Sequence, residues 1–204
     1  AGYVPPLTEV EALVDACAAR GHLLVLDGCY SAFVSPESPW RLARLAGPSC
    51  LVLLSWSKMF GIAGGRLAVA TGERALTRRL RLHRQEDHVN AYALHALRRT
   101  AGLLDAYRPI WLDIAAERDR VRALLLARHG LAVPESGGNF LHLPMRDAAE
   151  AHALTTALDR AGYRVRDMLD TAGLAHHVRF TVTGDTSGFV DTLDRLLGEG
   201  VRAA

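Results

Sequence analysis

Lys58 is the first residue whose side chain could carry chemistry. The chain has 204 residues, 24 of which are Lys or Arg, and Lys58 is the only lysine among them. A GC-rich coding sequence accounts for such an excess of arginine. A primary amine, however, forms an imine with an aldehyde, which a guanidinium group does not. The position that retains an amine is therefore the first candidate for a reactive residue.

Other polar side chains lie at the ends of predicted strands near Lys58. The continuous apolar runs 23–26 and 51–54 are typical of buried parallel strands, and a third strand is predicted over 66–71. The side chains at these strand ends are Asp27, Tyr30, Ser55, Ser57, Lys58 and Arg66. Because ligands bind outside the carboxyl ends of strands in open parallel sheets, we expect these residues to form one site.

The chemistry of these six side chains suits a ligand that has an aldehyde, a phosphate and a basic ring nitrogen. Pyridoxal 5'-phosphate has all three groups. Lys58 would form an imine with its aldehyde, Asp27 would pair with its ring nitrogen, and Tyr30 would hydrogen-bond its ring oxygen. The phosphate would be held by three further side chains, Ser55, Ser57 and Arg66.

The pattern of the whole chain predicts an α/β fold followed by a small α+β domain. Over the first 108 residues helices alternate with buried strands, which favours a mostly parallel sheet with helices on both faces. A capping box at Thr8–Glu11 predicts the start of the first helix. Further helices are predicted over 72–84, 91–104, 109–129, 148–161 and 186–197, and further strands over 139–143, near 165 and over 178–182. We expect domains at 1–108 and 109–204, the second beginning with a long connecting helix.

The spacing of the candidate residues resembles that of a known enzyme family. The segments 27–30 and 57–66 read DGCY and SKMFGIAGGR. They are similar to the signature of the fold-type I aminotransferases that use pyridoxal phosphate, and most similar to the histidinol-phosphate aminotransferase branch of class I/II. The resemblance implies a transaminase in which Lys58 carries the cofactor as a Schiff base. It also implies that residues 1–108 are an incomplete large cofactor-binding domain of that fold.

The same resemblance extends to the second domain. Two arginines, Arg166 and Arg179, are thirteen residues apart and resemble the two C-terminal arginine motifs of the family. The resemblance implies that Arg179 binds the acidic group of the substrate, which is a carboxylate or a phosphate in the family, and that Arg166 assists. Asn139, in the sequence Gly138-Asn139-Phe140, matches a recurrent Asn-Phe of the small domain and is a further candidate for substrate binding.

The resemblance also implies partners. Members of the family have an additional N-terminal half that contributes to the cofactor site and ends in Asn-Pro-x-Gly, and Ala1-Gly2 resembles the last two residues of that motif. We therefore expect a C-terminal portion of an enzyme, with the other half as a possible separate chain. A homodimer is expected by analogy, with a small-molecule amino donor and a keto acid as substrates.

Composition excludes several classes of protein. Half of the residues are hydrophobic and 23% are charged, so the chain is not disordered. A net charge of +2 does not favour a nucleic acid partner, and the arginine-rich stretch 74–84 has the pattern of an amphipathic surface helix. No apolar stretch approaches the length of a membrane span. Three cysteines without a CxxC pair predict reduced thiols and a cytoplasmic location, and the histidines form no metal motif.

Each candidate residue taken alone has an ordinary structural explanation. Lys58 could be a surface lysine, Asp27 a turn cap and Tyr30 a half-buried core aromatic. The two arginines could be surface salt-bridge partners, and Asn139 could cap a turn. The combined spacing of residues 27, 30, 57, 58 and 66 favours the cofactor site instead.

Three functions are open at this point. The leading hypothesis is transamination between an amino acid, or a similar amine, and a keto acid. A decarboxylase of the same fold, related to the threonine-phosphate decarboxylases, is the first alternative. A catalytically inactive partner or fragment is the second. Gly28 and Cys29 depart from the usual residues of the family, which leaves the substrate open.

Overall fold

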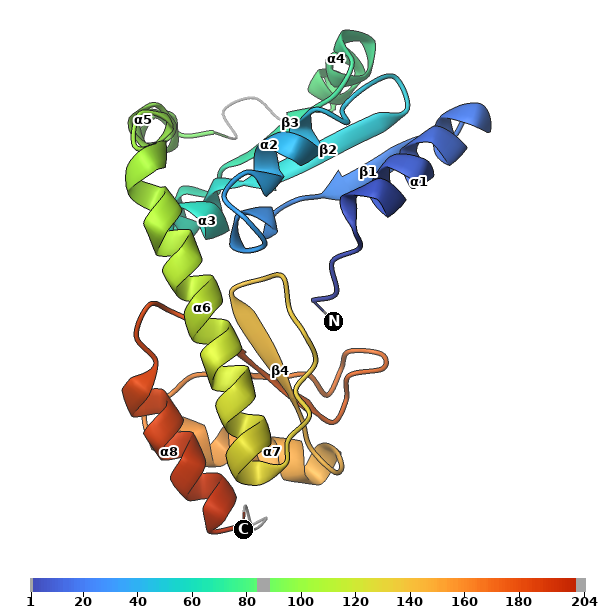
Figure 1. Ribbon diagram of the computed structural model, residues 1–204. Coiled ribbons are helices and arrows are strands. Elements are labelled where there is room, and N and C mark those ends of the chain that lie inside the picture. Colours follow the sequence, from blue (N-terminus) through green and yellow to red (C-terminus); the bar gives the residue numbers. More distant parts are fainter. Residues whose placement is uncertain (1, 84–88, 201–204) are drawn as a thin grey trace. The chain divides into compact units, whose positions relative to one another are not determined.

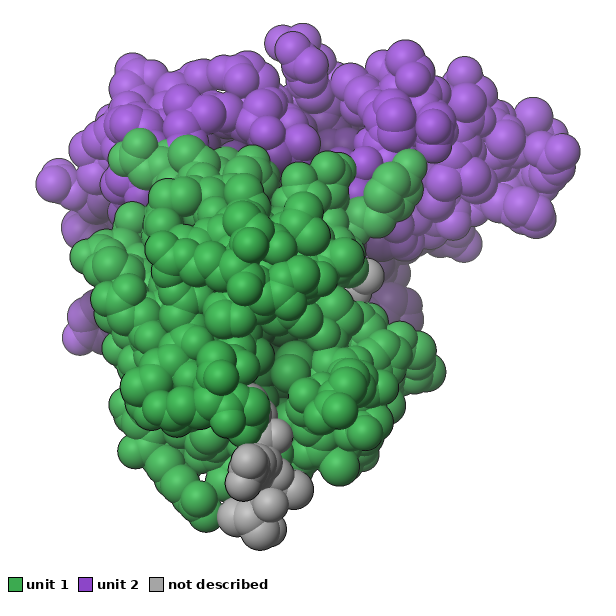
Figure 2. Space-filling model, turned by 60° about the horizontal axis from the view of Figure 1, so that its bottom comes forward, with its two compact units in different colours: residues 1–3, 113–204 green, residues 4–112 purple. Residues whose placement is uncertain are grey.

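The computed structural model describes residues 2–83 and 89–200, which fall into two compact units. Unit 1 comprises Ala1–Tyr3 and Asp113–Ala204, and unit 2 comprises Val4–Leu112 (Figure 2). The units divide inside the long helix α6 (Leu104–His129), whereas the sequence places the domain boundary at residue 109. Each unit has its own sheet.

Unit 2 is built on a three-stranded sheet in the order β1-β2-β3 (Figure 1). Its strands are β1 (Leu24–Asp27), β2 (Cys50–Ser55) and β3 (Ala68–Thr71). β1 runs parallel to β2, as expected, but β3 is antiparallel to β2, with Ala68 opposite Ser55. The alternation of helix and strand did not predict this reversal. Its consequence is that β3 begins beside the carboxyl end of β2.

The expectation that the first strand is buried is wrong for one of its faces. Leu23 and Val25 are each 50% exposed, whereas β2 is buried over most of its length. β1 pairs with β2 alone among the described strands, and its side chains alternate between two faces. The face that carries Val25 is not covered by described residues of unit 2.

The helices of unit 2 are α1 (Leu7–Ala19), α2 (Ser38–Ala43), α3 (Trp56–Met59), α4 (Arg74–Leu82) and α5 (Ala91–Ala101), with short 3-10 turns η1 (Ser31–Phe33) and η2 (Ala63–Gly65). Three of them, α1, α4 and α5, were predicted and have shifted ends, whereas α2 and α3 were not predicted. The predicted capping box is wrong, because α1 begins after Pro6 and no side chain caps it. Arg84, the predicted end of the fourth helix, lies outside the described residues.

Aromatic side chains anchor α3, the one-turn helix that contains Ser57 and Lys58. The ring of Phe60 lies 5.3 Å from that of Trp56 and 5.6 Å from that of Trp111. The Trp111 indole N–H donates to the Met59 carbonyl at 2.5 Å, and the Trp56 N–H donates to the Thr100 hydroxyl at 2.9 Å. A helix of four residues is unstable by itself, so these contacts hold α3 in place.

Unit 1 contains a second, antiparallel sheet with the strand order β4-β6-β5. Its elements are α6, β4 (Phe140–Pro144), α7 (Ala148–Arg160), β5 (Arg166–Asp167), β6 (His177–Thr181) and α8 (Ser187–Gly198). The core joins one face of this sheet to helices α6, α7 and α8 through residues such as Leu125, Leu141, Leu154, Phe180 and Leu193. The opposite face carries the side chains of His142 and Arg179, which alternate with core residues.

The two helices predicted over 91–104 and 109–129 are α5 and α6, with a different junction. α6 begins at Leu104, so Pro109 lies inside it rather than in its first turn. The end is as predicted: Gly130 has φ +64, and its N–H donates to the Leu126 carbonyl. Glycine adopts this left-handed conformation without steric strain and ends the helix there.

Replacing Trp111 by Phe tests the anchoring of α3. Trp111→Phe keeps an aromatic ring but removes the donor to the buried Met59 carbonyl, so the free energy of unfolding should fall by about 1–3 kcal/mol. Urea denaturation of the chain measures this change. The control is Trp40→Phe at a half-buried ring, which should change the unfolding free energy by less than about 1 kcal/mol. Equal effects of the two substitutions would show that the hydrogen bond is unimportant.

Candidate active site

Four of the predicted residues lie at one edge of the unit 2 sheet. Asp27 is the last residue of β1 and pairs with Leu53, and Ser55 ends β2 two residues further on. Ser57 and Lys58 follow directly in α3. Because β1 and β2 are parallel, their carboxyl ends meet at the same edge. The Lys58 side chain is exposed, whereas Ser57 is only 9% exposed.

A tight turn after β1 places Tyr30 near Lys58. The Lys58 ammonium lies 5.9 Å from the centre of the Tyr30 ring, within the range of a cation–π contact. Gly28 makes the turn possible: a Cβ there would lie 2.9 Å from a methyl carbon of Leu54 and 3.1 Å from the Leu53 carbonyl oxygen. The close packing of this turn against β2 therefore leaves no room for a side chain at position 28.

Arg66 reaches the same edge because β3 is antiparallel. It directly precedes Leu67, whose carbonyl accepts a hydrogen bond from the Trp56 N–H at 3.1 Å. A parallel third strand would have placed its first residue at the opposite edge of the sheet. Arg66 has φ +49 and ψ +43, and it is the one non-glycine residue with positive φ in the described parts of the chain. Such strain is concentrated at functional sites.

Cys29 belongs to the same cluster, although sequence reasoning treated it only as a departure from the family. Its backbone N–H donates to the Asp27 carboxylate at 3.0 Å. Burial raises the pKa of the Cys29 thiol to about 12, and a hydrogen bond from the thiol to Asp27 adds to the shift. The Ser55 hydroxyl and the Lys58 charge act in the opposite direction. The thiol is therefore a neutral donor to Asp27 rather than a nucleophile.

The three predicted residues of the second domain lie in unit 1. Arg166 of β5 and Arg179 of β6 are directly opposite each other in the antiparallel ladder. The Arg179 guanidinium lies 4.1 Å from the centre of the Phe140 ring. Asn139 precedes β4, and its backbone carbonyl accepts a hydrogen bond from the Val182 N–H at 2.8 Å. The structure thus brings the two arginines together, and the role of the Asn139 side chain remains a prediction.

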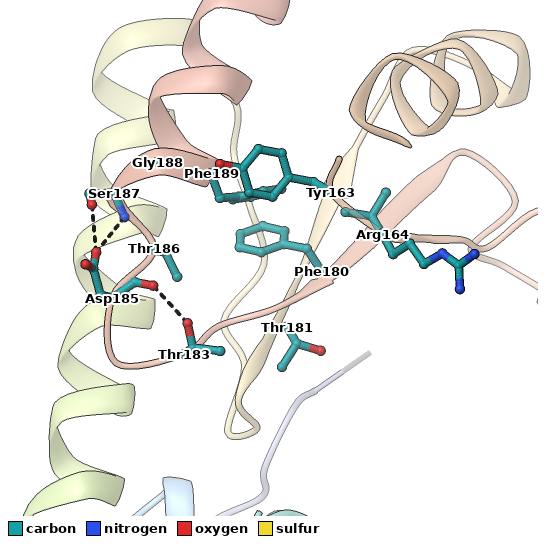
Figure 3. A pocket seen from close by; sticks show the side chains of 11 residues that line it. Tyr163, Arg164, Phe180, Thr181, Thr183, Asp185, Thr186, Ser187, Gly188 and Phe189 are labelled. Atoms are coloured by element: carbon teal, nitrogen blue, oxygen red, sulfur yellow. Dashed lines mark hydrogen bonds between the residues drawn. The ribbon is translucent and has the colours of Figure 1, made fainter. Parts of the chain in front are cut away.

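A hollow of about 340 Å³ in unit 1 contains none of the predicted site residues (Figure 3). Its walls include the rings of Tyr163, Phe180 and Phe189, which pack against one another. At its other end, the Asp185 carboxylate accepts hydrogen bonds from the backbone N–H and the hydroxyl of Ser187. These polar groups are satisfied within the unit, so the hollow does not define a site by itself.

The described residues contain neither a metal-binding cluster nor a membrane-spanning helix. Within 2–83 and 89–200, no group of three or more His, Cys, Asp or Glu side chains is arranged to hold a metal ion. No helix in these ranges is both long and apolar enough to cross a bilayer.

The fold of the chain is that of the fold-type I aminotransferases. The structure of histidinol-phosphate aminotransferase from Sinorhizobium meliloti, a complex with pyridoxal-5'-phosphate, matches with a TM-score of 0.78 and 23% identity. That match covers 98% of this chain and 54% of the other. L-threonine-O-3-phosphate decarboxylase from Porphyromonas gingivalis matches with a TM-score of 0.80 and 21% identity, over 97% of this chain and 61% of the other.

Sequence comparison identifies the family. The model of aminotransferase class I and II matches residues 1–196, so the chain belongs to this family of pyridoxal-phosphate-dependent transferases. Histidinol-phosphate aminotransferase from Paenarthrobacter aurescens (strain TC1) is 30% identical over 198 residues. This match covers 94% of the chain and 50% of the relative, so the chain spans about half the length of that relative.

The residues present at the unit 2 edge fit the cofactor of the family. The residues at this edge supply one carboxylate, one phenol, one amine, one guanidinium and two hydroxyls, and the amine is exposed near the phenol ring. Sequence reasoning missed the aromatic anchor of α3. A usable signal is the i, i+4 spacing of aromatic residues, with Trp56 and Phe60 around Lys58 and Tyr107 and Trp111 in α6.

Substituting Arg66 separates stability from cofactor binding. Arg66→Gly relieves the left-handed strain, so the unfolding free energy should stay unchanged or rise by up to about 1 kcal/mol. Affinity for pyridoxal phosphate should fall by roughly tenfold or more, because a charge-assisted contact to phosphate is lost. Arg66→Lys keeps the charge and the strain. Urea denaturation and cofactor titration measure the two effects, and an unchanged affinity in both variants would remove Arg66 from the site.

The thiol of Cys29 should resist alkylation. With a pKa of about 12, it should react with iodoacetamide near pH 8 roughly a hundredfold more slowly than an ordinary thiol. Asp27→Asn replaces the carboxylate by a neutral amide, which removes the negative charge and leaves a weaker acceptor, so the pKa should fall and the reaction should become faster. Mass spectrometry of the peptides gives each rate, with Cys17 as the internal control. A Cys29 rate that does not respond to Asp27→Asn would contradict the thiol–carboxylate contact.

Proposed function

We propose that the chain is the lysine-bearing part of an aminotransferase that moves an amino group between an amino acid, or a similar amine, and a keto acid. The observation that carries this proposal is the position of Lys58. The only lysine of the chain lies beside Tyr30, at the edge where Asp27, the two serines and Arg66 converge. Membership of the class I and II aminotransferases supports it.

Each residue of this edge has a role that follows from its chemistry. The bound cofactor supplies an aldehyde for Lys58 and an electron-accepting ring. Asp27 keeps the ring nitrogen protonated, and the Cys29 N–H and thiol orient that carboxylate. Tyr30 donates to the ring oxygen. The phosphate is bound by three side chains, Ser55, Ser57 and Arg66. The freed amine of Lys58 then moves a proton from the α-carbon of the substrate.

The second group of residues binds the substrate. Arg166 and Arg179 lie opposite each other on one face of the unit 1 sheet, which suits an acidic group of the amine substrate. Asn139, at the start of β4, is proposed to contact the same substrate.

A decarboxylase is the alternative that a specific observation favours. A threonine-phosphate decarboxylase has the same fold, and one fold can carry different reactions. The products separate the two. A keto acid formed from the amine substrate supports transamination, whereas release of carbon dioxide supports decarboxylation.

We also propose that further polypeptide of the same family completes the site, either in a longer chain or as a separate subunit, and that the enzyme forms a homodimer. The chain spans about half of its relative, and β1 exposes Leu23 and Val25. The remaining alternative is an inactive partner subunit. Cofactor titration with and without an added N-terminal half of a relative distinguishes these cases, since tight binding by this chain alone would contradict the need for completion.

Reductive labelling tests the reactive lysine. The chain is mixed with pyridoxal phosphate, alone and with the N-terminal half of a relative, and is then reduced with borohydride. Because the chain has one lysine, a cofactor mass on a lysine peptide of this chain must be at Lys58. Lys58→Ala and Lys58→Arg should both lose the label and the visible absorbance. Arg fails because guanidinium forms no imine.

The outcome that would contradict the proposal is equally definite. Absorbance and label that persist in Lys58→Ala would place the reactive amine elsewhere. Absence of the label from wild-type protein under both conditions would favour the inactive partner.

A further inference from the structure

The sheet of unit 1 carries a row of three basic side chains on the face opposite its core. Arg179 of β6 pairs with His142 of β4 on one side and with Arg166 of β5 on the other. Directly opposed residues of antiparallel strands project from the same face, with Cβ atoms about 5 Å apart. The strand register therefore fixes the row His142–Arg179–Arg166, whatever the side-chain conformations. Sequence reasoning singled out the arginines but not His142.

The row places like charges next to each other. Two arginines in directly opposed positions repel each other, and an anion bound over both would relieve that repulsion. Arg166 is exposed and makes no ion pair with a residue in the described ranges. The Phe140 ring packs against the Arg179 guanidinium at 4.1 Å and against the His142 ring at 5.4 Å. This apolar wall strengthens the electrostatic effect of the row on an anion.

His142 is buried beside these charges with an unpaired polar atom. Its side chain is 4% exposed, and its Nδ1 atom has no hydrogen-bond partner among the described residues. The same holds for Nδ1 of His177, which is 9% exposed and whose ring centre lies 6.3 Å from that of His142. A buried polar atom without a partner costs about 1–3 kcal/mol. Such an atom in a residue paired with Arg179 indicates a place for a polar ligand.

Burial, with a smaller contribution from positive charges, keeps His142 neutral at ordinary pH. Burial lowers the pKa of the imidazole to about 4, and the positive charges of the chain's N-terminus, of Arg179 and of His177 add to the shift. Burial also lowers the pKa of His177. The charge of His176, whose ring centre lies 4.3 Å away, is the second cause of this shift. An anion bound next to His142 would offset both the burial and the arginine charge, and so raise the pKa.

We propose that His142 is a specificity-determining residue: it makes the row bind a tetrahedral dianion, such as a phosphate ester or phosphonate, in preference to a single carboxylate, by taking up one proton as the dianion binds. The inference rests on the proposed function, since the dianion would be the acidic group of the amine substrate. Two arginines match the two charges, and the imidazolium adds a third donor. A carboxylate carries one negative charge, which is fewer than the two positive charges of the arginines. Its binding therefore does not favour protonation of His142.

Sulfate is the probe, because it remains a dianion across the useful pH range and takes up no proton itself. The chain carries Arg66→Gln, which removes the other predicted anion site. Calorimetry in two buffers of different ionisation enthalpy counts the protons taken up. We expect close to one proton near pH 5, and an affinity that rises up to about tenfold per unit fall in pH while only the bound form is protonated. Acetate, measured near pH 7 where it is fully ionised, should bind more weakly and without proton uptake.

Matched variants assign the proton. His142→Gln keeps a polar side chain of similar size but cannot titrate, so proton uptake should fall close to zero. His177→Gln, on the same face but outside the row, should keep the uptake. Arg179→Gln should weaken sulfate binding at every pH. The inference is overturned if sulfate does not bind, if acetate binds equally well, or if His142→Gln still takes up the proton.

A second measurement needs no substitution in the row. In the NMR spectrum of the folded chain, sulfate should raise the pKa of the His142 ring, whose signal is identified by its loss in His142→Gln. If no histidine signal changes its pKa when sulfate is added, the inference is overturned even if the variants fail to fold. Reductive labelling at Lys58 does not involve the row, so its result tests the proposed function independently.

Discussion

The antiparallel pairing of β3 with β2 is the constraint on which the candidate site depends. β1 and β2, as parallel strands, bring Asp27, Ser55 and the start of α3 to one edge. Arg66 comes before its strand, so only the reversed direction of β3 delivers it to that edge. The Trp56–Leu67 backbone hydrogen bond extends the ladder by one step and requires the chain to turn sharply at Arg66, which accounts for the positive φ there.

The same edge shows how a short helix can hold a reactive side chain. Lys58 is exposed, but the residues on either side of it, Ser57 and Met59, are buried. The contact between the rings of Phe60 and Trp111 and the hydrogen bond from Trp111 to the Met59 carbonyl fix the backbone of α3. The lysine amine therefore moves only through its own side-chain torsions, and its backbone stays in place when the amine is attached to a ligand or released.

The sequence was sufficient for the family and the fold class, and these predictions are confirmed. Continuous apolar runs and helical periodicity depend on local residues, so β2, β4, β6 and most helices could be located directly. Strand direction and burial depend on neighbours far along the chain. For this reason the reversal of β3 and the exposed face of β1 were not predicted. The aromatic anchor was missed for the same reason, because it joins α3 to a helix about fifty residues further on.

The unit 1 sheet illustrates why register carries information that composition does not. In the sequence alone, Arg166 and Arg179 have the character of ordinary surface residues, and His142 lies in an apolar segment. The ladder alone shows that the three are adjacent on one face, while Leu141, Leu143 and Phe180 occupy the other. A sheet that needed only a stable core could place neutral residues on its second face. Two directly opposed arginines, next to a buried imidazole whose Nδ1 has no partner among the described residues, suit the binding of an anion.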